Sequence, residues 1–148
     1  MASGAPDGPL LPWVDDVTRP FWEGCRRGEL RVQRCHDTGR LLFPPREVSP
    51  FGARRQPEWV AVPATGTIWS FVVAHPPLLS YFAERAPYNV ILVALDADPA
   101  VRLAGNLLAR EGGDLGEVDP GTIEIGAAVR AVFEVVTDEV TLPRWVRV

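Results

Sequence analysis

The sequence predicts a mainly β protein in which a short N-terminal helix and a β-hairpin precede a small C-terminal barrel. From Glu58 onward, runs rich in valine, isoleucine and aromatic residues alternate with turns that contain Gly, Pro or Asp. Before residue 58, one stretch has helical periodicity, and no long helix is expected anywhere. The 148 residues suit one domain with a small appendage, and an apolar fraction of 47% is sufficient for a core.

The N-terminal part is predicted to contain an arm and then a helix. Residues 1–12 are mainly Gly, Pro, Ala, Asp and Leu, and we expect them to form a flexible arm. Residues 13–29 are expected to hold the helix, from about Asp16 to Arg27. Apolar side chains recur there at helical spacing, namely Val14, Val17, Phe21, Trp22 and Cys25. Thr18 is the expected N-cap, and Gly28 is expected to end the helix.

Residues 30–57 resemble a rubredoxin-like zinc ribbon that has lost its metal. Strands are expected over Leu30–Cys35 and Arg40–Phe43, on either side of a turn at residues 36–39. A zinc ribbon needs two knuckles of roughly C-x2-C, because Zn²⁺ takes about four sulfur or nitrogen ligands. The corresponding positions here are Cys35, Thr38, Ser49 and Gly52. With one thiol left, we expect no zinc and no other cofactor.

Nothing near Cys35 replaces the missing thiols. His36 and Asp37 adjoin it, and adjacent residues rarely converge on one metal. A structural zinc contributes about 10 kcal/mol in small peptides, so a ribbon without it must lean on the barrel or on a partner subunit. Apolar packing is expected to replace the metal, through Leu42, Phe43, Phe51 and Trp59.

Residues 58–148 are expected to form a five-stranded barrel of the OB type, in which closure protects the strand edges. Gly105, at the centre of one strand, permits a sharp coil or a close backbone approach, and Pro143 suggests an edge position for the last strand. A β-sandwich is the alternative that the sequence leaves open. Five or six strands are expected in this part of the chain, over Glu58–Pro63, Thr67–His75, Asn89–Asp96, Val101–Ala109, Val129–Val136 and Glu139–Val146.

Composition excludes several classes of protein. The net charge is −4, and fifteen arginines occur without a lysine, which argues against a nucleic-acid binder with a basic face. No apolar run reaches the eighteen residues of a membrane span, and the N-terminus lacks the features of a secretory signal. Two cysteines, Cys25 and Cys35, do not make a disulfide framework. We therefore expect a cytoplasmic protein with reduced thiols.

No catalytic residues are predicted. His36 lies in the knuckle, and His75 ends a strand before two prolines, where a bond to the backbone is its expected role. Cys25 lies on the apolar face of the helix, and Cys35 has no motif of an activated thiol beside it. The sequence contains no G-x-S-x-G, P-loop or G-x-G-x-x-G motif.

The order of motifs resembles the DUF35 family. A helix with PFWEG precedes QRC-x-x-x-GR-L-x-FPPR, and EWV, GTIWSF and DP-x-T-I-x-IG follow the ribbon remnant. The resemblance covers nearly the whole chain after residue 12. It implies an N-terminal helix, a zinc ribbon and an OB-fold. Residues 81–109 and the late LPRW are most similar to the DUF35 subunit that accompanies steroid side-chain-cleaving aldolases.

The resemblance implies a non-catalytic accessory subunit of an acyl-CoA-processing complex. Family members are partners of thiolase-superfamily enzymes or of acyl-CoA hydratases. The narrower likeness implies a hetero-oligomer with a thiolase-like aldolase, which performs retro-aldol cleavage of a CoA thioester. The subunit would order the active site of its partner and help to enclose the acyl-CoA, a possible ligand.

Candidate ligand-binding or partner-binding residues are Trp22, Arg46, Tyr81, Phe82 and Tyr88. The aromatic segment at residues 76–89 either caps the barrel or forms an interface. Arg46, with Arg54 and Arg55, either meets CoA phosphates or belongs to a solvated loop. Trp13 and Trp22 are expected to face a partner, and most other tryptophans to be core.

Two other functions stay open. An OB-fold can bind single-stranded nucleic acid on stacking aromatic residues, and Trp69 and Phe71 fit this if they share an exposed strand face. A small independent enzyme on the barrel is the weaker alternative.

Overall fold

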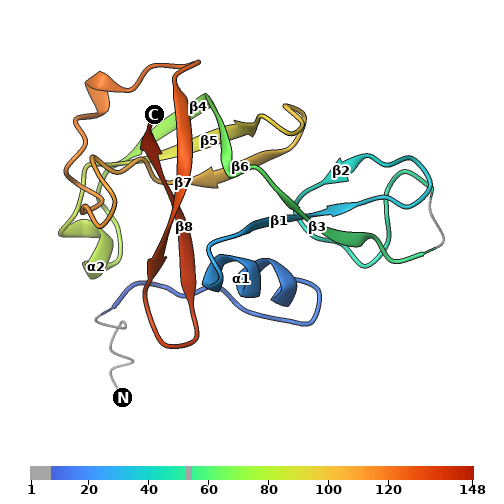
Figure 1. Cartoon of the computed structure of the whole chain (residues 1–148). Coiled ribbons are helices and arrows are strands. Elements are labelled where there is room, and N and C mark those ends of the chain that lie inside the picture. Colours follow the sequence, from blue (N-terminus) through green and yellow to red (C-terminus); the bar gives the residue numbers. More distant parts are fainter. Residues whose placement is uncertain (1–7, 53–54) are drawn as a thin grey trace.

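The computed structural model describes residues 8–52 and 55–148, in which helix, ribbon and barrel follow in the predicted order (Figure 1). The mainly β class is confirmed. Most of the expected arm, residues 1–7, and Arg54 lie outside the described residues. Within the described ranges, no helix is long and apolar enough to cross a membrane.

Helix α1 spans Arg19–Arg26 and is shorter at its start than predicted. Thr18 is the N-cap, but its side chain does not bond to the helix. Instead, the carboxylate of Asp15 accepts hydrogen bonds from the Thr18 N–H at 2.8 Å and from the Thr18 hydroxyl at 2.9 Å. This local loop holds residues 15–18 outside the helix. Gly28, at φ +72°, ends the last turn as predicted.

A small antiparallel sheet follows, with the order β2-β1-β3. Its strands are β1 (Leu30–Arg34), β2 (Leu41–Leu42) and β3 (Glu58–Val62). The first two form the predicted hairpin. The third was expected at the start of the barrel, but all five of its residues pair with β1. Because β1 has a second edge whose backbone groups need partners, β3 completes the ribbon's sheet before the chain enters the barrel.

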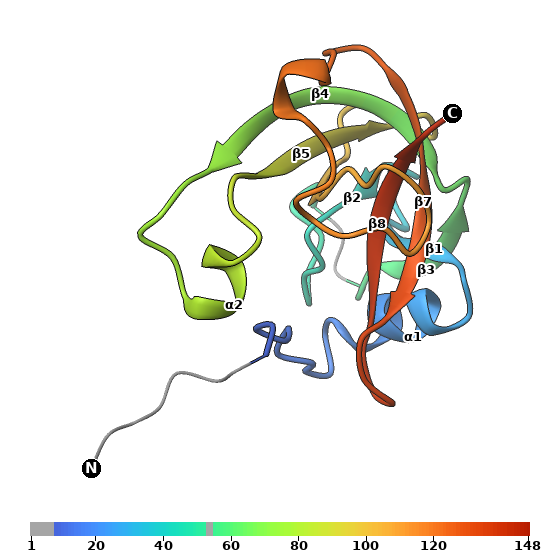
Figure 2. The same ribbon diagram turned by 90° about the vertical axis from the view of Figure 1, so that its left-hand side faces the viewer.

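A larger antiparallel sheet has the order β6-β5-β4-β7-β8 and forms the five-stranded unit predicted from the sequence. Its strands are β4 (Thr65–Ala74), β5 (Tyr88–Leu95), β6 (Arg102–Gly105), β7 (Ala128–Val135) and β8 (Thr141–Arg147). Figure 2 shows β4 arching over the sheet, which curls into a barrel-like shape. Strand β8, which contains Pro143, lies at the edge as predicted.

The two edge strands of the curled sheet meet at Trp145. Its backbone N–H donates to the carbonyl of Asn106 at 3.0 Å, and its carbonyl accepts from the N–H of Leu108 at 2.8 Å. Strand β6 is only four residues long, because the chain after Gly105 leaves β5 and joins β8. This closure agrees with an OB-fold and not with a sandwich.

Two short elements connect the strands. Helix α2 (Ser80–Ala83) lies between β4 and β5, within the aromatic segment, and was not predicted. A single 3-10 turn at Pro120–Thr122 follows Asp119, whose carboxylate accepts from the N–H of Gly121 at 2.9 Å.

One apolar core unites the three parts of the chain. Phe21 and Cys25 of α1 and Val32 of β1 belong to the same buried cluster as Ile91 and Trp145 of the barrel. Burial raises the pKa of the Cys25 thiol to about 12, which agrees with its structural role. The ribbon therefore packs on the barrel, which is one of the two supports expected for a ribbon without zinc.

Candidate functional site at the junction of helix, ribbon and barrel

Three of the four vestigial knuckle positions come together in space. Hydrogen bonds from the hydroxyls of Ser49 and Thr38 to the sulfur of Cys35 lower the pKa of this thiol to about 7. Cys35 and Ser49 are both buried. Gly52, at φ +90°, closes the second knuckle turn and has no side chain to offer.

These residues do not fit a structural zinc. The ion takes about four sulfur or nitrogen ligands, whereas the knuckles present one sulfur and two hydroxyls. His36 and Asp37 are exposed beside Cys35. Across residues 8–52 and 55–148, no three His, Cys, Asp or Glu side chains gather as a metal site would require.

Polar and aromatic contacts hold the ribbon together instead. The buried amide of Gln33 donates to the carbonyl of Arg46 at 2.8 Å and accepts from its N–H at 2.7 Å. The guanidinium of Arg40 lies 4.0 Å from the ring centre of Phe51, which packs on Cys35 and Leu42. Leu42 and Phe51 thus supply apolar packing at the knuckles, as predicted.

The other two predicted replacements, Phe43 and Trp59, pack against the main core instead. They brace the ribbon on the barrel and helix, whereas Leu42 and Phe51 pack at the knuckles. The ribbon is therefore supported at two places.

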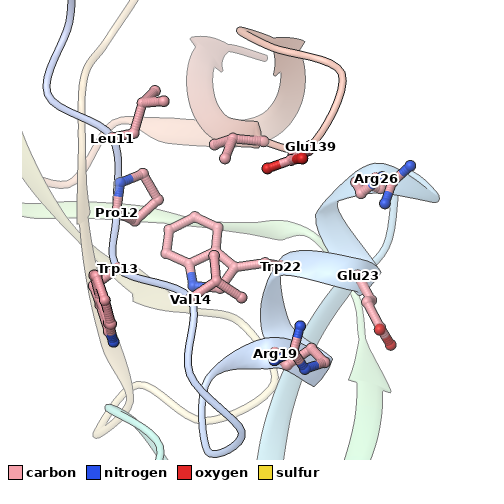
Figure 3. A pocket seen from close by; sticks show the side chains of 10 residues that line it. Leu11, Pro12, Trp13, Val14, Arg19, Trp22, Glu23, Arg26 and Glu139 are labelled. Carbon is pink, nitrogen blue, oxygen red and sulfur yellow. The ribbon is translucent and has the colours of Figure 1, made fainter.

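Trp22 separates two cavities at the junction. The first, of about 550 Å³, lies between residues 11–14, helix α1 and the β7–β8 turn. Figure 3 shows Trp22 facing Pro12 and Val14, whereas Trp13 points away from it. The side chain of Trp13 is 86% exposed. The cavity wall mixes charges, with Arg19, Arg26, Glu23 and Glu139 around the apolar residues.

The second cavity, which we call the junction cavity, has a volume of about 380 Å³ and mainly apolar walls. It lies where helix α1, the end of the hairpin, β6 and β8 meet. Its lining comprises Thr18, Phe21, Trp22, Phe43, Pro44, Pro45, Leu103, Ala104, Gly105, Asn106, Leu142, Pro143, Arg144 and Trp145.

Sequence reasoning did not find the junction cavity, apart from Trp22. Two signals were present: Gly105 was recognised as a point of close backbone approach, and Pro143 as an edge residue. A Cβ atom at position 105 would lie 2.6 Å from Nε1 of Trp145. The glycine therefore admits the indole, and the predicted close approach is confirmed.

The remaining predicted site residues lie elsewhere. Tyr81, Phe82 and Tyr88 come together. The ring centres of Tyr81 and Phe82 are 5.2 Å apart, and those of Phe82 and Tyr88 are 5.9 Å apart. Phe82 and Tyr88 pack on a second apolar cluster in the barrel. Figure 1 shows α2 on the side of the barrel away from the ribbon. Arg46 lies in the ribbon and is exposed. The five predicted residues therefore do not form one site.

The residues considered for nucleic-acid binding and for independent catalysis do not come together in the structure. Trp69 is half-exposed, but the guanidinium of Arg102 lies 3.8 Å from its ring centre, and Phe71 packs against the core. They offer no shared stacking surface for bases. His36 and His75 are both exposed, one in the ribbon and one at the end of β4.

The five tryptophans differ in burial. Trp145 is the only fully buried one, whereas Trp22 and Trp59 are partly buried. Trp69 and Trp13 are exposed to different degrees. Of the tryptophans expected in the core, Trp145 lies in it and Trp59 packs against it, so the expectation is confirmed for all but Trp69.

Comparison with known proteins places both structural parts in one group. The profile of the ChsH2 C-terminal OB-fold domain matches residues 59–134, and that of the ChsH2 rubredoxin-like zinc ribbon domain matches residues 22–48. The second match covers the first knuckle, including Cys35 and Thr38.

Three curated proteins are similar in sequence. The chain is 32% identical over 128 residues to the 3-oxo-4,17-pregnadiene-20-carboxyl-CoA hydratase alpha subunit of Mycobacterium tuberculosis, covering 86% of this chain and 37% of the relative. It is 32% identical over 124 residues to a probable enoyl-CoA hydratase alpha subunit of Thermomonospora curvata, covering 83% and 35%. The chain thus spans about a third of each hydratase subunit.

The third curated relative is of similar length. It is a DUF35 domain-containing scaffold protein of Methanothermobacter thermautotrophicus, 30% identical over 115 residues. The match covers 77% of this chain and 78% of that relative.

Two solved structures are also similar. A chain of the Ltp2–ChsH2(DUF35) aldolase superposes with a TM-score of 0.77 and 28% identity, covering 93% of this chain and 98% of that one. A DUF35 protein of unknown function from Sulfolobus solfataricus has a TM-score of 0.59 at 13% identity, over 90% and 86% of the two chains, and supports the fold alone.

Proposed function

Because the chain belongs to the DUF35 family of ChsH2-type zinc-ribbon and OB-fold proteins, we propose that it is a non-catalytic accessory subunit of an acyl-CoA-processing complex. The partner is a thiolase-like aldolase, which performs retro-aldol cleavage of a CoA thioester, and the acyl group is of the steroid side-chain type. The subunit orders the active site of the partner and helps to enclose the acyl-CoA.

The likeness to a chain of the Ltp2–ChsH2(DUF35) aldolase is the observation that carries this proposal. It extends over 98% of that chain at 28% identity, so it includes the helix, the ribbon and the barrel together. A scaffold role also agrees with the printed name of the archaeal relative. The separation of both histidines from the two cavities supports a role without catalysis.

Exposed apolar side chains near α1 suit a contact with a partner subunit. Leu10, Leu11 and Trp13 are all exposed within four residues of chain. Large aromatic side chains are common anchors in protein interfaces, and a tryptophan that its own fold leaves 86% exposed gains most by burial against another chain. We therefore place the partner on this N-terminal surface, with Trp22 behind it.

The other candidate residues fit the same proposal in different ways. Arg46 is exposed, so its guanidinium is accessible to a phosphate of CoA. Tyr81, Phe82 and Tyr88 form a packed aromatic group whose outer rings remain half-exposed. They give the partner a rigid surface at the α2 side of the barrel.

An acyl-CoA hydratase is the second candidate partner. The observation in its favour is the 32% identity to two hydratase alpha subunits. Both of these relatives extend well beyond the region that matches this chain. In this alternative, the chain serves the same accessory role for hydration of an unsaturated acyl-CoA.

Co-expression decides between these proposals. The chain is tagged and produced with the thiolase-like aldolase of its own host, and separately with the acyl-CoA hydratase. We expect the aldolase to co-elute from a sizing column and to lose activity when the chain is omitted. Failure to co-elute, together with full activity of the aldolase alone, would refute the proposal. Co-elution with the hydratase alone would support the second candidate.

A further inference from the structure

We propose that the free edge of strand β4, residues Ser70–Ala74, pairs with the same edge of a second copy of this chain across a two-fold axis. The curled sheets of the two copies thereby join edge to edge, β4 against β4. This inference does not rest on the proposed function, because it concerns the chain by itself and a surface on the side of the molecule away from helix α1.

Strand β4 has a neighbour on both sides only along its first part. It pairs with β5 from Gly66 to its end at Ala74. On its other side, β7 pairs with Thr65–Thr67 alone. The last bonds on this side belong to Ile68, whose N–H donates to the carbonyl of Ala127 at 3.0 Å and whose carbonyl accepts from the N–H of Gly126 at 2.7 Å. The rest of the strand continues without β7.

A β-bulge creates this free edge. The register between β4 and β5 shifts between Ile68 and Ser70, and a bulge of this kind bends a strand and increases its twist. Figure 2 shows β4 arching away over the sheet. Within residues 8–52 and 55–148, the backbone of Ser70–Ala74 has no hydrogen bond on the side away from β5. Since alternate residues of an antiparallel strand point their N–H and C=O groups to each side, this edge presents both donors and acceptors.

The features that usually protect an open strand edge are missing here. Soluble proteins place charged residues or prolines on such edges, because an open edge is a template for another strand. The segment Ser70–Ala74, with the sequence SFVVA, contains neither, and Val72 is 63% exposed. Strand β3, at the edge of the ribbon's sheet, differs in that it begins with Glu58 and lies between Pro57 and Pro63. The edge of β4 therefore suits an occupant with an extended backbone.

A second copy of this chain satisfies that requirement, because the segment is complementary to itself. In an antiparallel pair centred on Val72, this residue faces its own copy. Ser70 then faces Ala74 on the same side of the sheet, and Phe71 faces Val73 on the other side. Pairs of β-branched residues and of aromatic with β-branched residues are favourable, whereas like charges opposite each other are not. No charge occurs among these residues, and a two-fold axis uses the same patch on both copies.

This edge and the N-terminal surface can be used at the same time. Figures 1 and 2 both show β4 at the top of the molecule and α1 at the bottom. The paired segment is short, and interfaces that bury less than about 1,200 Å² are typically weak or transient. We therefore expect a reversible dimer that forms at high concentration and leaves the surface around Trp13 open to another subunit.

Analytical ultracentrifugation of the full chain tests the dimer. The sedimentation coefficient is followed over a roughly hundredfold range of concentration, since a weak dimer dissociates by mass action on dilution. Val72→Lys places two like charges opposite each other at the axis, and its exposed position leaves the fold intact. We expect this variant to raise the dissociation constant of the dimer at least tenfold. Val135→Lys, at a position of β7 that is 74% exposed, is the matched control and should change nothing.

A mixing experiment tests the two-fold register. Val72→Glu should also be monomeric, for the same reason as Val72→Lys. Because Val72 faces its own copy, an equal mixture of the two variants places opposite charges together at the axis. We expect the mixture to dimerise at least tenfold more tightly than either variant alone.

Hydrogen exchange of the parent chain gives a second measurement that needs no variant. The amides of residues 70–74 that point away from β5 should exchange more slowly as the concentration of the chain rises, because pairing occupies them. Amides of the exposed loop at residues 110–113 serve as the reference and should not change.

Four results would overturn the inference. They are a parent chain that stays monomeric throughout, equal effects of Val72→Lys and Val135→Lys, a mixture no tighter than its components, and slowed exchange of residues 70–74 only when the aldolase is added. The last result would assign the edge to a strand of the partner subunit. None of the four bears on co-elution with the aldolase, so this inference and the proposed function fail independently.

Discussion

The side-chain amide of Gln33 bonds both backbone groups of Arg46, accepting from its N–H at 2.7 Å and donating to its carbonyl at 2.8 Å. It thereby fastens the chain between the two knuckles to β1, across thirteen residues of sequence. Asn89 does the same in the barrel, where its buried amide pairs with the N–H and the carbonyl of Leu107 at 2.7 and 2.9 Å. Each side-chain amide thus pairs with the backbone groups of a residue that lies outside the strands.

Gln33→Met should destabilise the ribbon. Methionine keeps the length of the side chain but leaves the N–H and carbonyl of Arg46 without partners, which costs about 1–3 kcal/mol in the free energy of unfolding. Urea denaturation measures this loss. Gln56→Met, at an exposed position, is the control and should change stability little. Equal stability of the two variants would contradict the proposed clamp.

Restoring the missing thiols should restore zinc binding. Thr38→Cys, Ser49→Cys and Gly52→Cys together with Cys35 give four thiolates, and we expect one zinc per chain by metal analysis. The parent chain should contain none in stoichiometric amount. Gly52 has φ +90°, where a side chain costs about 1–2 kcal/mol, so the variant without metal should be less stable than the parent.

A control variant tests whether zinc binds at the knuckles. Adding Cys35→Ser to the three substitutions removes one ligand and should lower the affinity for zinc at least tenfold. Stoichiometric zinc in the purified parent chain would contradict the view that this ribbon works without metal.

Ser49→Ala should raise the pKa of Cys35. The hydroxyl of Ser49 is the strongest of the groups that hold this pKa near 7, and its loss moves the thiol toward its ordinary value. The ultraviolet absorbance of the thiolate, followed against pH, measures the shift. Cys35→Ser identifies the signal, since it should abolish this step in the titration. An unchanged midpoint in Ser49→Ala would refute the role of the hydroxyl.

The two cysteines should give stability an opposite dependence on pH. The pKa of Cys35 is lower in the folded chain than in the unfolded one, so its contribution is present above the unfolded pKa and is lost as pH falls toward 7. The pKa of Cys25 is raised to about 12, so its contribution is present below the unfolded pKa and is lost as pH rises through 12. Unfolding of the parent and of Cys35→Ser, compared between these limits, separates the two effects.

Gly105→Ala should destabilise the barrel. The new methyl group would stand 2.6 Å from Nε1 of Trp145, within van der Waals contact, so the indole or the strand must move. Overpacking of this kind costs about 1–3 kcal/mol, which thermal or urea unfolding measures. Gly8→Ala has open space around the new methyl group and serves as the control. A Gly105→Ala chain as stable as the control would show that the indole can shift freely.

Trp13→Ala should weaken the complex without weakening the fold. The side chain is 86% exposed in the isolated chain, so its removal costs little stability. An interface anchor contributes about 2 kcal/mol or more, which corresponds to a roughly 30-fold rise in the dissociation constant. Calorimetry with the aldolase measures the affinity. Trp69→Ala, on the barrel, is the matched control. Equal loss in both variants would refute the N-terminal interface.

Residue identity and local periodicity determined the order of parts. The helix ends at Gly28 because a glycine adopts φ +72° readily, and β8 is an edge strand, in agreement with Pro143, which cannot donate to a ladder. The expectation that the ribbon binds no zinc also comes from the sequence, since three of the four knuckle positions lack a thiol. Each of these conclusions needs only one residue and its neighbours.

The tertiary structure alone decided what depends on distant residues. Strand β3 joins the ribbon's sheet because β1, some thirty residues earlier, has a free edge. Ser49 reaches the sulfur of Cys35 only after the chain has turned back, and the junction cavity draws its walls from four separate segments. Local periodicity cannot predict these contacts, because packing between elements determines them and the propensity of a single element does not.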